Sequence, residues 1–151
     1  MFQNLQNYQE ALQAFSTGLQ YEPENLNLIE QSAECFAILG NNRDAILFYE
    51  KAVNLDTTNL AVAAKLGRVH INLKDYKNAY QVFSDIYKQD SSNIYWNKQL
   101  AYSAFRIFNR KRASYLYEKV LEAYPLDYGS YSNLIHTYNW KNEGGKIMET
   151  I

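Results

Sequence analysis

Apolar residues recur every 34 residues along the whole length of the chain. Alanines recur at this interval, and an aromatic residue follows each of them four residues later. The alanines are Ala11, Ala45, Ala79 and Ala113, and the aromatic residues are Phe15, Tyr49, Phe83 and Tyr117. Further small or aliphatic residues follow each alanine at seven and eight residues, which places the whole set on one face of an α-helix. The pattern therefore predicts one amphipathic helix around each alanine.

A second helix precedes the alanine helix in each repeat. Its residues keep the same spacing, as in Ala33, Gly67 and Ala101. Short polar residues that can cap a helix precede both helices: Asn25, Asn59, Asn93 and Asp127 before the first, and Asn7, Asn41, Asp75 and Asn109 before the second. We therefore predict full repeats at 26–59, 60–93 and 94–127. A partial repeat at 1–25 contains a helix at 8–21, and a partial repeat at 128–151 contains a helix at about 128–141 followed by Gly144-Gly145 and a stub.

The pattern resembles the tetratricopeptide repeat (TPR), a 34-residue helix–turn–helix unit. Two motifs carry the resemblance: Asn7-Tyr8-x-x-Ala11-x-x-x-Phe15-x-x-Gly18-Leu19-x-x-x-Pro23 and Asp75-Tyr76-x-x-Ala79-x-x-x-Phe83. The resemblance covers the whole chain and implies an all-α fold, a right-handed α-solenoid of stacked antiparallel hairpins that forms a single domain over 1–151. One hairpin cannot bury its apolar face alone, so neighbours stack and leave an extended concave surface.

The resemblance also implies which residues face that groove. In TPR proteins the groove is lined mainly by first helices and receives a peptide or helix of a partner. The matching positions are Asn27, Glu30, Glu34, Lys65, Arg68, Asn72, Tyr95, Lys98, Gln99, Tyr102, Arg106 and His136. Their cations, grouped around Tyr95 and Tyr102, would suit an acidic partner with an apolar anchor. The alternative is a merely solvated helix face. The Lys/Asn/Arg carboxylate clamp of the chaperone-binding members is not reproduced, because Glu34, Arg68 and Tyr102 occupy its Asn-type positions.

Composition changes this picture little. The 151 residues carry a net charge of −1, which disfavours a nucleic-acid partner. The charge is uneven, since residues 1–60 hold 8 acids and 2 bases while residues 61–119 hold 4 acids and 11 bases. No run approaches the length of a membrane span and the first residues lack a signal pattern, so we expect a soluble protein without a membrane partner. The compartment is not predicted.

Candidate chemistry is sparse. The two histidines, His70 and His136, lack metal-ligand spacing, and the single cysteine, Cys35, lacks an activating partner. We therefore expect neither enzymatic activity nor a cofactor or metal. The leading interpretation is a protein–protein interaction module or scaffold. One alternative is an assembly solenoid that self-associates through apolar surface on its terminal helices, and another is an accessory domain of a larger regulatory protein or enzyme.

Overall fold

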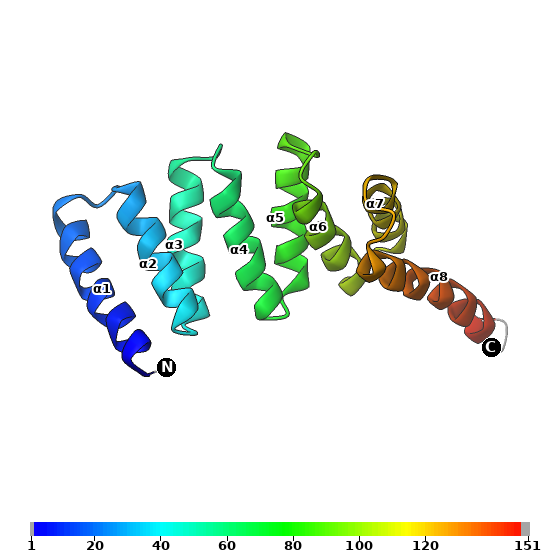
Figure 1. The fold of residues 1–151 in the computed structure, drawn as a ribbon, viewed down its shortest axis with the longest axis horizontal. Helices are drawn as coiled ribbons and strands as arrows, with labels where there is room; N and C mark the ends of the chain where they lie inside the picture. The colour runs from blue at the N-terminus through cyan, green and yellow to red at the C-terminus, as the bar shows by residue number, and fades with distance from the viewer. Residues whose placement is uncertain (1, 149–151) are drawn as a thin grey trace. The chain divides into compact units, whose positions relative to one another are not determined.

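A computed structural model describes the backbone of residues 2–148 and the side chains of residues 5–139. Residues 2–148 form α-helices joined by short turns (Figure 1). The helices are α1 (Phe2–Tyr21), α2 (Leu26–Ile38), α3 (Asn42–Leu55), α4 (Leu60–Asn72), α5 (Tyr76–Gln89), α6 (Ile94–Arg106), α7 (Arg110–Ala123) and α8 (Tyr128–Met148). First helices begin at residues 26, 60, 94 and 128, and second helices at 42, 76 and 110. Successive first helices start 34 residues apart, and so do successive second helices. This is the interval that separates Ala45 from Ala79, so these helix starts confirm the predicted period.

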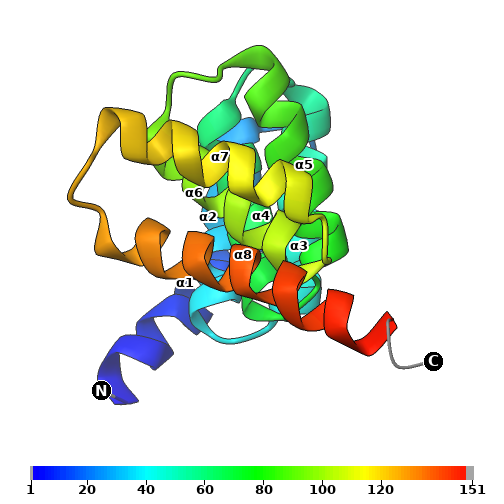
Figure 2. The same ribbon diagram turned by 90° about the vertical axis from the view of Figure 1, so that its right-hand side faces the viewer.

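The chain divides into two compact units. Unit 1 ends at Asp75 and contains α1 to α4, while unit 2 begins at Tyr76 and contains α5 to α8. Within each unit every helix packs against the next one along the chain. Figure 2 shows α7 and α8 of unit 2 as adjacent helices that run in opposite directions. The boundary between the units falls inside the predicted repeat 60–93, between its two helices.

The recurring alanines form the core of both units. Ala45, Ala79 and Ala113 each have 0% of their surface exposed, and the aromatic residues that follow them are also buried. Methyl groups at these positions let neighbouring helices approach closely, while the aromatic rings fill the space one turn further on. The pattern of buried positions read from the sequence is confirmed in these repeats.

Asparagine side chains begin most of the helices, as predicted. The Oδ1 atoms of Asn25, Asn59 and Asn93 accept hydrogen bonds from the backbone N–H three residues later, at 3.1 to 3.2 Å. Asn41 and Asn109 do the same before the second helices. Each bond satisfies one of the N–H groups that a helix start leaves unpaired.

Two helix ends that lack a proline are closed by a signal that the sequence analysis missed. The Asp56 carboxylate accepts hydrogen bonds from the Thr58 amide at 3.0 Å and the Thr58 hydroxyl at 2.6 Å. Asp90 binds Ser92 in the same way, at 2.8 and 2.6 Å. These Asp-x-Thr/Ser turns stop the helix because the side chain takes the place of a backbone acceptor.

The predictions for the two terminal helices were wrong in their limits. Helix α1 begins at Phe2, so Asn7 lies inside the helix instead of capping it. No proline or glycine precedes Asn7 in the given sequence, and an asparagine inside a helix costs only a fraction of 1 kcal/mol, roughly 0.6. Helix α8 continues to Met148 through Gly144-Gly145, because glycine weakens a helix but keeps its backbone N–H. The stub predicted to end at Ile151 lies partly outside the described residues.

The turn inside each helix pair adopts a left-handed conformation at one residue. Gly40, Lys74 and Phe108 have φ of 78°, 62° and 63°, and each stands one repeat after the last. After each of them the next amide donates to the carbonyl five residues back, for example Asp75 to His70 at 2.8 Å. This arrangement is a Schellman motif, and it satisfies the last carbonyls of the first helix.

Candidate functional site

Four of the predicted groove residues line one cavity in unit 1. The cavity has a volume of about 240 Å³ and lies between α2, α3 and α4. Its lining includes Glu34 from α2 and Lys65, Arg68 and Asn72 from α4. The three α4 residues follow one another at intervals of three and four, so they share one face of that helix. Apolar side chains of Ala37, Ile38 and Val69 complete the lining together with Tyr49.

The polar groups of this cavity are not equivalent. Lys65 Nζ donates to Glu34 Oε2 at 2.9 Å, so this cation already has a carboxylate. Arg68 and Asn72 are exposed, and their side chains have no hydrogen-bond or ion-pair partner among the described residues. Tyr49 is only 3% exposed, and burial together with the nearby Glu34 raises its pKa to about 12, although Arg68 opposes the shift. The cavity thus offers a free guanidinium, a free amide and a protonated phenol.

The other two candidate residues of unit 1 differ in their contacts. Glu30 Oε1 accepts a hydrogen bond from Asn59 Nδ2 at 3.1 Å, so this carboxylate holds the residue that caps α4. Asn27 is exposed on α2. Glu30 therefore has a structural contact that the sequence analysis did not anticipate.

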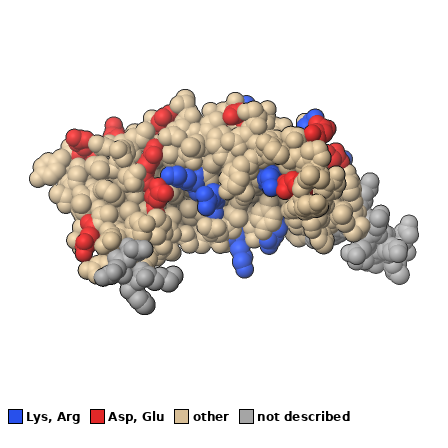
Figure 3. All heavy atoms as spheres, in the orientation of Figure 1, with Lys and Arg blue, Asp and Glu red and all other residues tan. Residues whose placement is uncertain are grey.

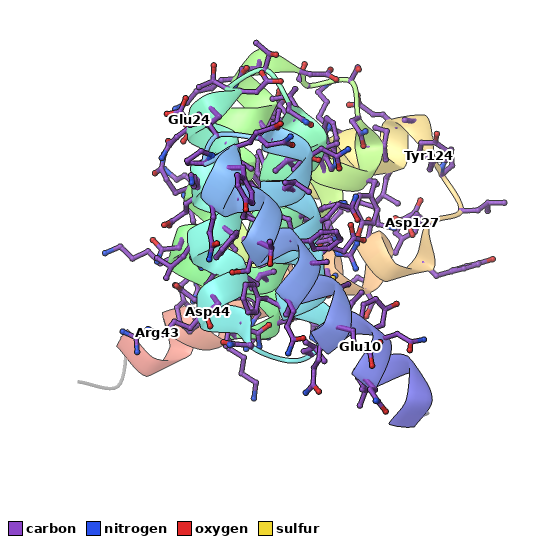
Figure 4. The ribbon with its side chains drawn as sticks, turned by 90° about the vertical axis from the view of Figure 1, so that its left-hand side faces the viewer. Glu10, Glu24, Arg43, Asp44, Tyr124 and Asp127 are labelled. Carbon is purple, nitrogen blue, oxygen red and sulfur yellow. The ribbon has the colours of Figure 1, made fainter. Side chains whose placement is uncertain are left out.

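The contact between Glu30 and Asn59 has a counterpart in unit 2, where a lysine and an aspartate occupy the two positions. Lys98 Nζ lies 2.8 Å from Asp127 Oδ2, and these residues occupy the positions of Glu30 and Asn59 two repeats later. The pairing with Lys98 and a hydrogen bond from the Ser130 hydroxyl lower the pKa of Asp127. Tyr95 and Lys98 line a cavity of about 650 Å³ with the α7–α8 turn, where Tyr124 and Asp127 are labelled in Figure 4.

An arginine of unit 2 is stacked on two tyrosines. Arg106 Nη1 donates to the Tyr102 hydroxyl at 2.7 Å, and its guanidinium lies 4.0 Å from the centre of the Tyr76 ring. The Tyr76 and Tyr102 rings meet edge to face at 5.8 Å. Tyr76 opens the second helix of its repeat, so the selection of first-helix positions missed it; its place in the Asp75-Tyr76 motif was the available signal.

The remaining candidates do not join a common cluster. Gln99 is half-buried on α6, and His136 is exposed on α8. Lys65 and Arg68 belong to unit 1 while Lys98 and Arg106 belong to unit 2, so the single basic surface around Tyr95 and Tyr102 stays a prediction. His70, predicted to be a packing residue, is buried, and its Nδ1 lies 3.1 Å from Asp75 Oδ2.

Figure 3 shows where charged side chains lie on one face. Acidic side chains predominate where the N-terminal helices α1 to α3 form the surface, as the sequence count suggested. Within the described part of the chain, no group of three His, Cys, Asp or Glu side chains is arranged to hold a metal ion. None of the described helices combines the length and apolar character needed to cross a membrane.

Both the sequence and the structure of the chain were compared with known proteins. No family model matches the chain. In sequence, 88 residues are 25% identical to Hsp70-Hsp90 organizing protein 2 of Arabidopsis thaliana, and the same holds for the Hsp70-Hsp90 organizing protein of Triticum aestivum. The matched segment is 58% of this chain, and it spans only 15% of each of these relatives.

Solved structures agree over nearly the whole chain. The MamA protein superimposes with a TM-score of 0.82 at 18% identity, covering 97% of this chain and 80% of MamA. YrrB, described as a TPR protein with an unusual peptide-binding site, gives 0.82 at 16% identity, covering 93% and 72%. A TPR protein from Parabacteroides merdae gives 0.72 at 18% identity, covering 97% and 57%. The fold is therefore that of a TPR α-solenoid, and the resemblance seen in the sequence motifs is confirmed at the level of the fold.

Proposed function

We propose that the chain is a non-catalytic protein-interaction module, and that the unit 1 cavity binds an acidic segment of a partner protein. The observation that carries the proposal is the cavity itself, in which Arg68 and Asn72 have no hydrogen-bond or ion-pair partner within residues 5–139 while Ile38 and Val69 supply apolar surface. YrrB, which has the same fold, is described as having a peptide-binding site, and this supports a peptide as the ligand.

The size of the cavity favours a side chain over a free small molecule. Pockets for small molecules usually have volumes of about 300–1,000 Å³. A cavity of about 240 Å³ suits one carboxylate side chain with a neighbouring aliphatic group. The planar guanidinium of Arg68 can bind both carboxylate oxygens, and the Asn72 amide and the Tyr49 hydroxyl can donate further hydrogen bonds.

A charge reversal at Arg68 tests the proposal. An array of peptides that combine glutamate with leucine or valine is screened first, and the best binder is titrated against Arg68→Glu. We expect the affinity to fall at least about tenfold, because a charge-assisted pair is lost and a repulsion is added. Arg43→Glu is the matched control, since Arg43 lies at the start of α3 and points outward (Figure 4). Equal losses in both variants would remove the cavity from the mechanism.

A second candidate function is self-association through α8. Tyr131, Ile135 and Tyr138 are 45%, 54% and 46% exposed on this helix. Ile135 occupies the repeat position at which Ala33 and Ala101 are completely buried. Sedimentation velocity over a wide concentration range tests this function. We expect association that Ile135→Glu weakens, and a wild-type chain that stays monomeric at every concentration would exclude it.

A further inference from the structure

A second arginine of unit 2 is stacked on tyrosines, on helices that the groove prediction does not use. Tyr87 belongs to α5, and Arg112 and Tyr115 belong to α7; we call these three residues the Arg112 cluster. The guanidinium of Arg112 lies 4.8 Å from the centre of the Tyr87 ring and 5.5 Å from that of Tyr115. Both helices are second helices of their pairs, whereas the candidates of unit 2 lie on the first helices α6 and α8.

The Arg112 guanidinium lies over the rings of Tyr87 and Tyr115, and its N–H donors have no acceptor among residues 5–139. Stacking against the ring faces orients a guanidinium without using its N–H groups. Arg112 is half-buried, and within residues 5–139 its side chain has no carboxylate or other hydrogen-bond acceptor. Burial and a hydrogen bond between the Tyr87 and Tyr115 hydroxyls raise the pKa of Tyr87, so this phenol remains protonated near neutral pH.

The other cations nearby are used differently. Lys88, Lys98 and Lys119 each have a carboxylate at 2.8 Å, from Asp85, Asp127 and Glu122. Three lysines of unit 2 are thus paired with its own acids, whereas Arg112 has no carboxylate partner among residues 5–139. A guanidinium beside the hydrogen-bonded Tyr87–Tyr115 pair, which keeps one hydroxyl proton free to donate, can bind the two oxygens of a carboxylate.

The repeat itself indicates that the cluster is not needed for folding. One repeat earlier, the positions of Tyr87, Arg112 and Tyr115 are held by Val53, Asn78 and Gln81. These residues are much less able to bind an anion, yet α3 and α5 form in the same register. The Arg112 cluster is thus an addition to the repeat pattern at a position where the fold accepts other residues.

We propose that the Arg112 cluster is a docking surface for an acidic segment of a second protein, independent of the unit 1 cavity. The occupant follows from charge complementarity: the surface offers a guanidinium without an acidic partner among residues 5–139, one free hydroxyl proton of the Tyr87–Tyr115 pair and the faces of aromatic rings. A segment with neighbouring glutamates or aspartates satisfies these donors, and its methylene groups can lie on the rings.

The test measures binding of a fluorescent hexaglutamate peptide by anisotropy, with hexaglutamine as the neutral comparison. All variants carry Arg68→Glu, so that the unit 1 cavity does not contribute and the two proposals can fail separately. We expect Arg112→Gln to weaken binding about tenfold and Arg112→Lys several-fold, because lysine keeps the charge but loses the planar pair of donors.

Lys111→Gln is the matched control, because it removes the same charge one residue away. Lys111 lines a different cavity, with Phe108, Ser114 and Tyr138, and should leave hexaglutamate binding within about twofold of its starting value. Circular dichroism of each variant verifies that the helices are intact.

Several results would overturn the proposal. Equal losses of affinity for Arg112→Gln and Lys111→Gln would mean that only the overall positive electrostatic potential of this surface attracts the peptide. Unchanged binding in Arg112→Gln, or equal binding of hexaglutamine, would exclude the cluster. Self-association at low salt that Arg112→Gln abolishes would identify a second copy as the occupant. Tighter, Arg112-dependent binding of a single-stranded oligonucleotide would identify a nucleic acid instead.

Discussion

Two phenylalanines occupy the same position of the repeat in different surroundings, and truncating each one tests the stacking principle of the fold. Phe83 in α5 is 1% exposed, while Phe15 in α1 is only half-buried. We expect Phe83→Ala to lower the free energy of unfolding by about 3–5 kcal/mol, the usual cost of emptying a buried aromatic site. Phe15→Ala should cost roughly half as much, about 1.5–2.5 kcal/mol, because less apolar surface is lost.

The loss expected for Phe83→Ala is a substantial part of the free energy of unfolding of one unit. A unit of roughly 75 residues is expected to be stable by about 4–11 kcal/mol. Phe83→Ala should therefore bring unit 2 close to its unfolding transition at room temperature. Both tryptophans, Trp96 and Trp140, belong to unit 2, so urea unfolding followed by fluorescence reports on this unit. Far-UV circular dichroism reports on all helices.

The outcome that would refute the reasoning is an equal cost for the two substitutions. Equal costs would mean that burial between neighbouring helices does not set the contribution of this position. A cost below about 1 kcal/mol for Phe83→Ala would also contradict the structure, since a completely buried ring cannot be removed so cheaply from a close-packed core.

Three further predictions concern packing, capping and pH. Ala79→Leu should cost about 1–3 kcal/mol through overpacking, because Ala79 has no exposed surface; an unchanged melting temperature would contradict this. Asn59→Ala should cost about 1 kcal/mol, since it removes the α4 cap, whereas Asn59→Gly should cost only a few tenths in the same urea titration. The pKa of Tyr49 is raised from about 10 to about 12, so its proton is lost more readily on unfolding and unit 1 should lose stability as pH rises from about 10 to 12. Tyr49→Phe should flatten this alkaline loss, and parallel curves for the two proteins would exclude Tyr49 as its source.

The helices were predicted well from the sequence because the residues that recur with the repeat are the ones that pack in the core. The positions of Ala45 and Tyr117 are buried in each of the second helices α3, α5 and α7, so the period alone locates them. The start of α1 and the end of α8 were missed because Asn7 and Gly144-Gly145 were interpreted as helix boundaries, whereas both lie inside the helices. The resemblance to the TPR pattern placed Arg68 and Asn72 on the groove face of one helix, and both residues line the cavity in unit 1.

The pairings between helices could not be predicted in the same way. The contacts of Glu34 with Lys65, and of Lys98 with Asp127, join residues about thirty positions apart. Whether two such side chains meet depends on their rotamers and on the helix crossing, which the sequence period does not specify. For the same reason, the contact of Arg112 with the Tyr87 and Tyr115 rings was not foreseen.

The left-handed turns show that this chain repeats a backbone conformation more faithfully than it repeats residue types. A glycine, a lysine and a phenylalanine hold φ values between 62° and 78° at positions 40, 74 and 108, although only glycine adopts them without steric cost. The fold thus requires a backbone conformation at this turn and accepts several side chains there, so sequences with little identity can form the same fold. Solved structures at 16–18% identity accordingly match this chain with TM-scores up to 0.82.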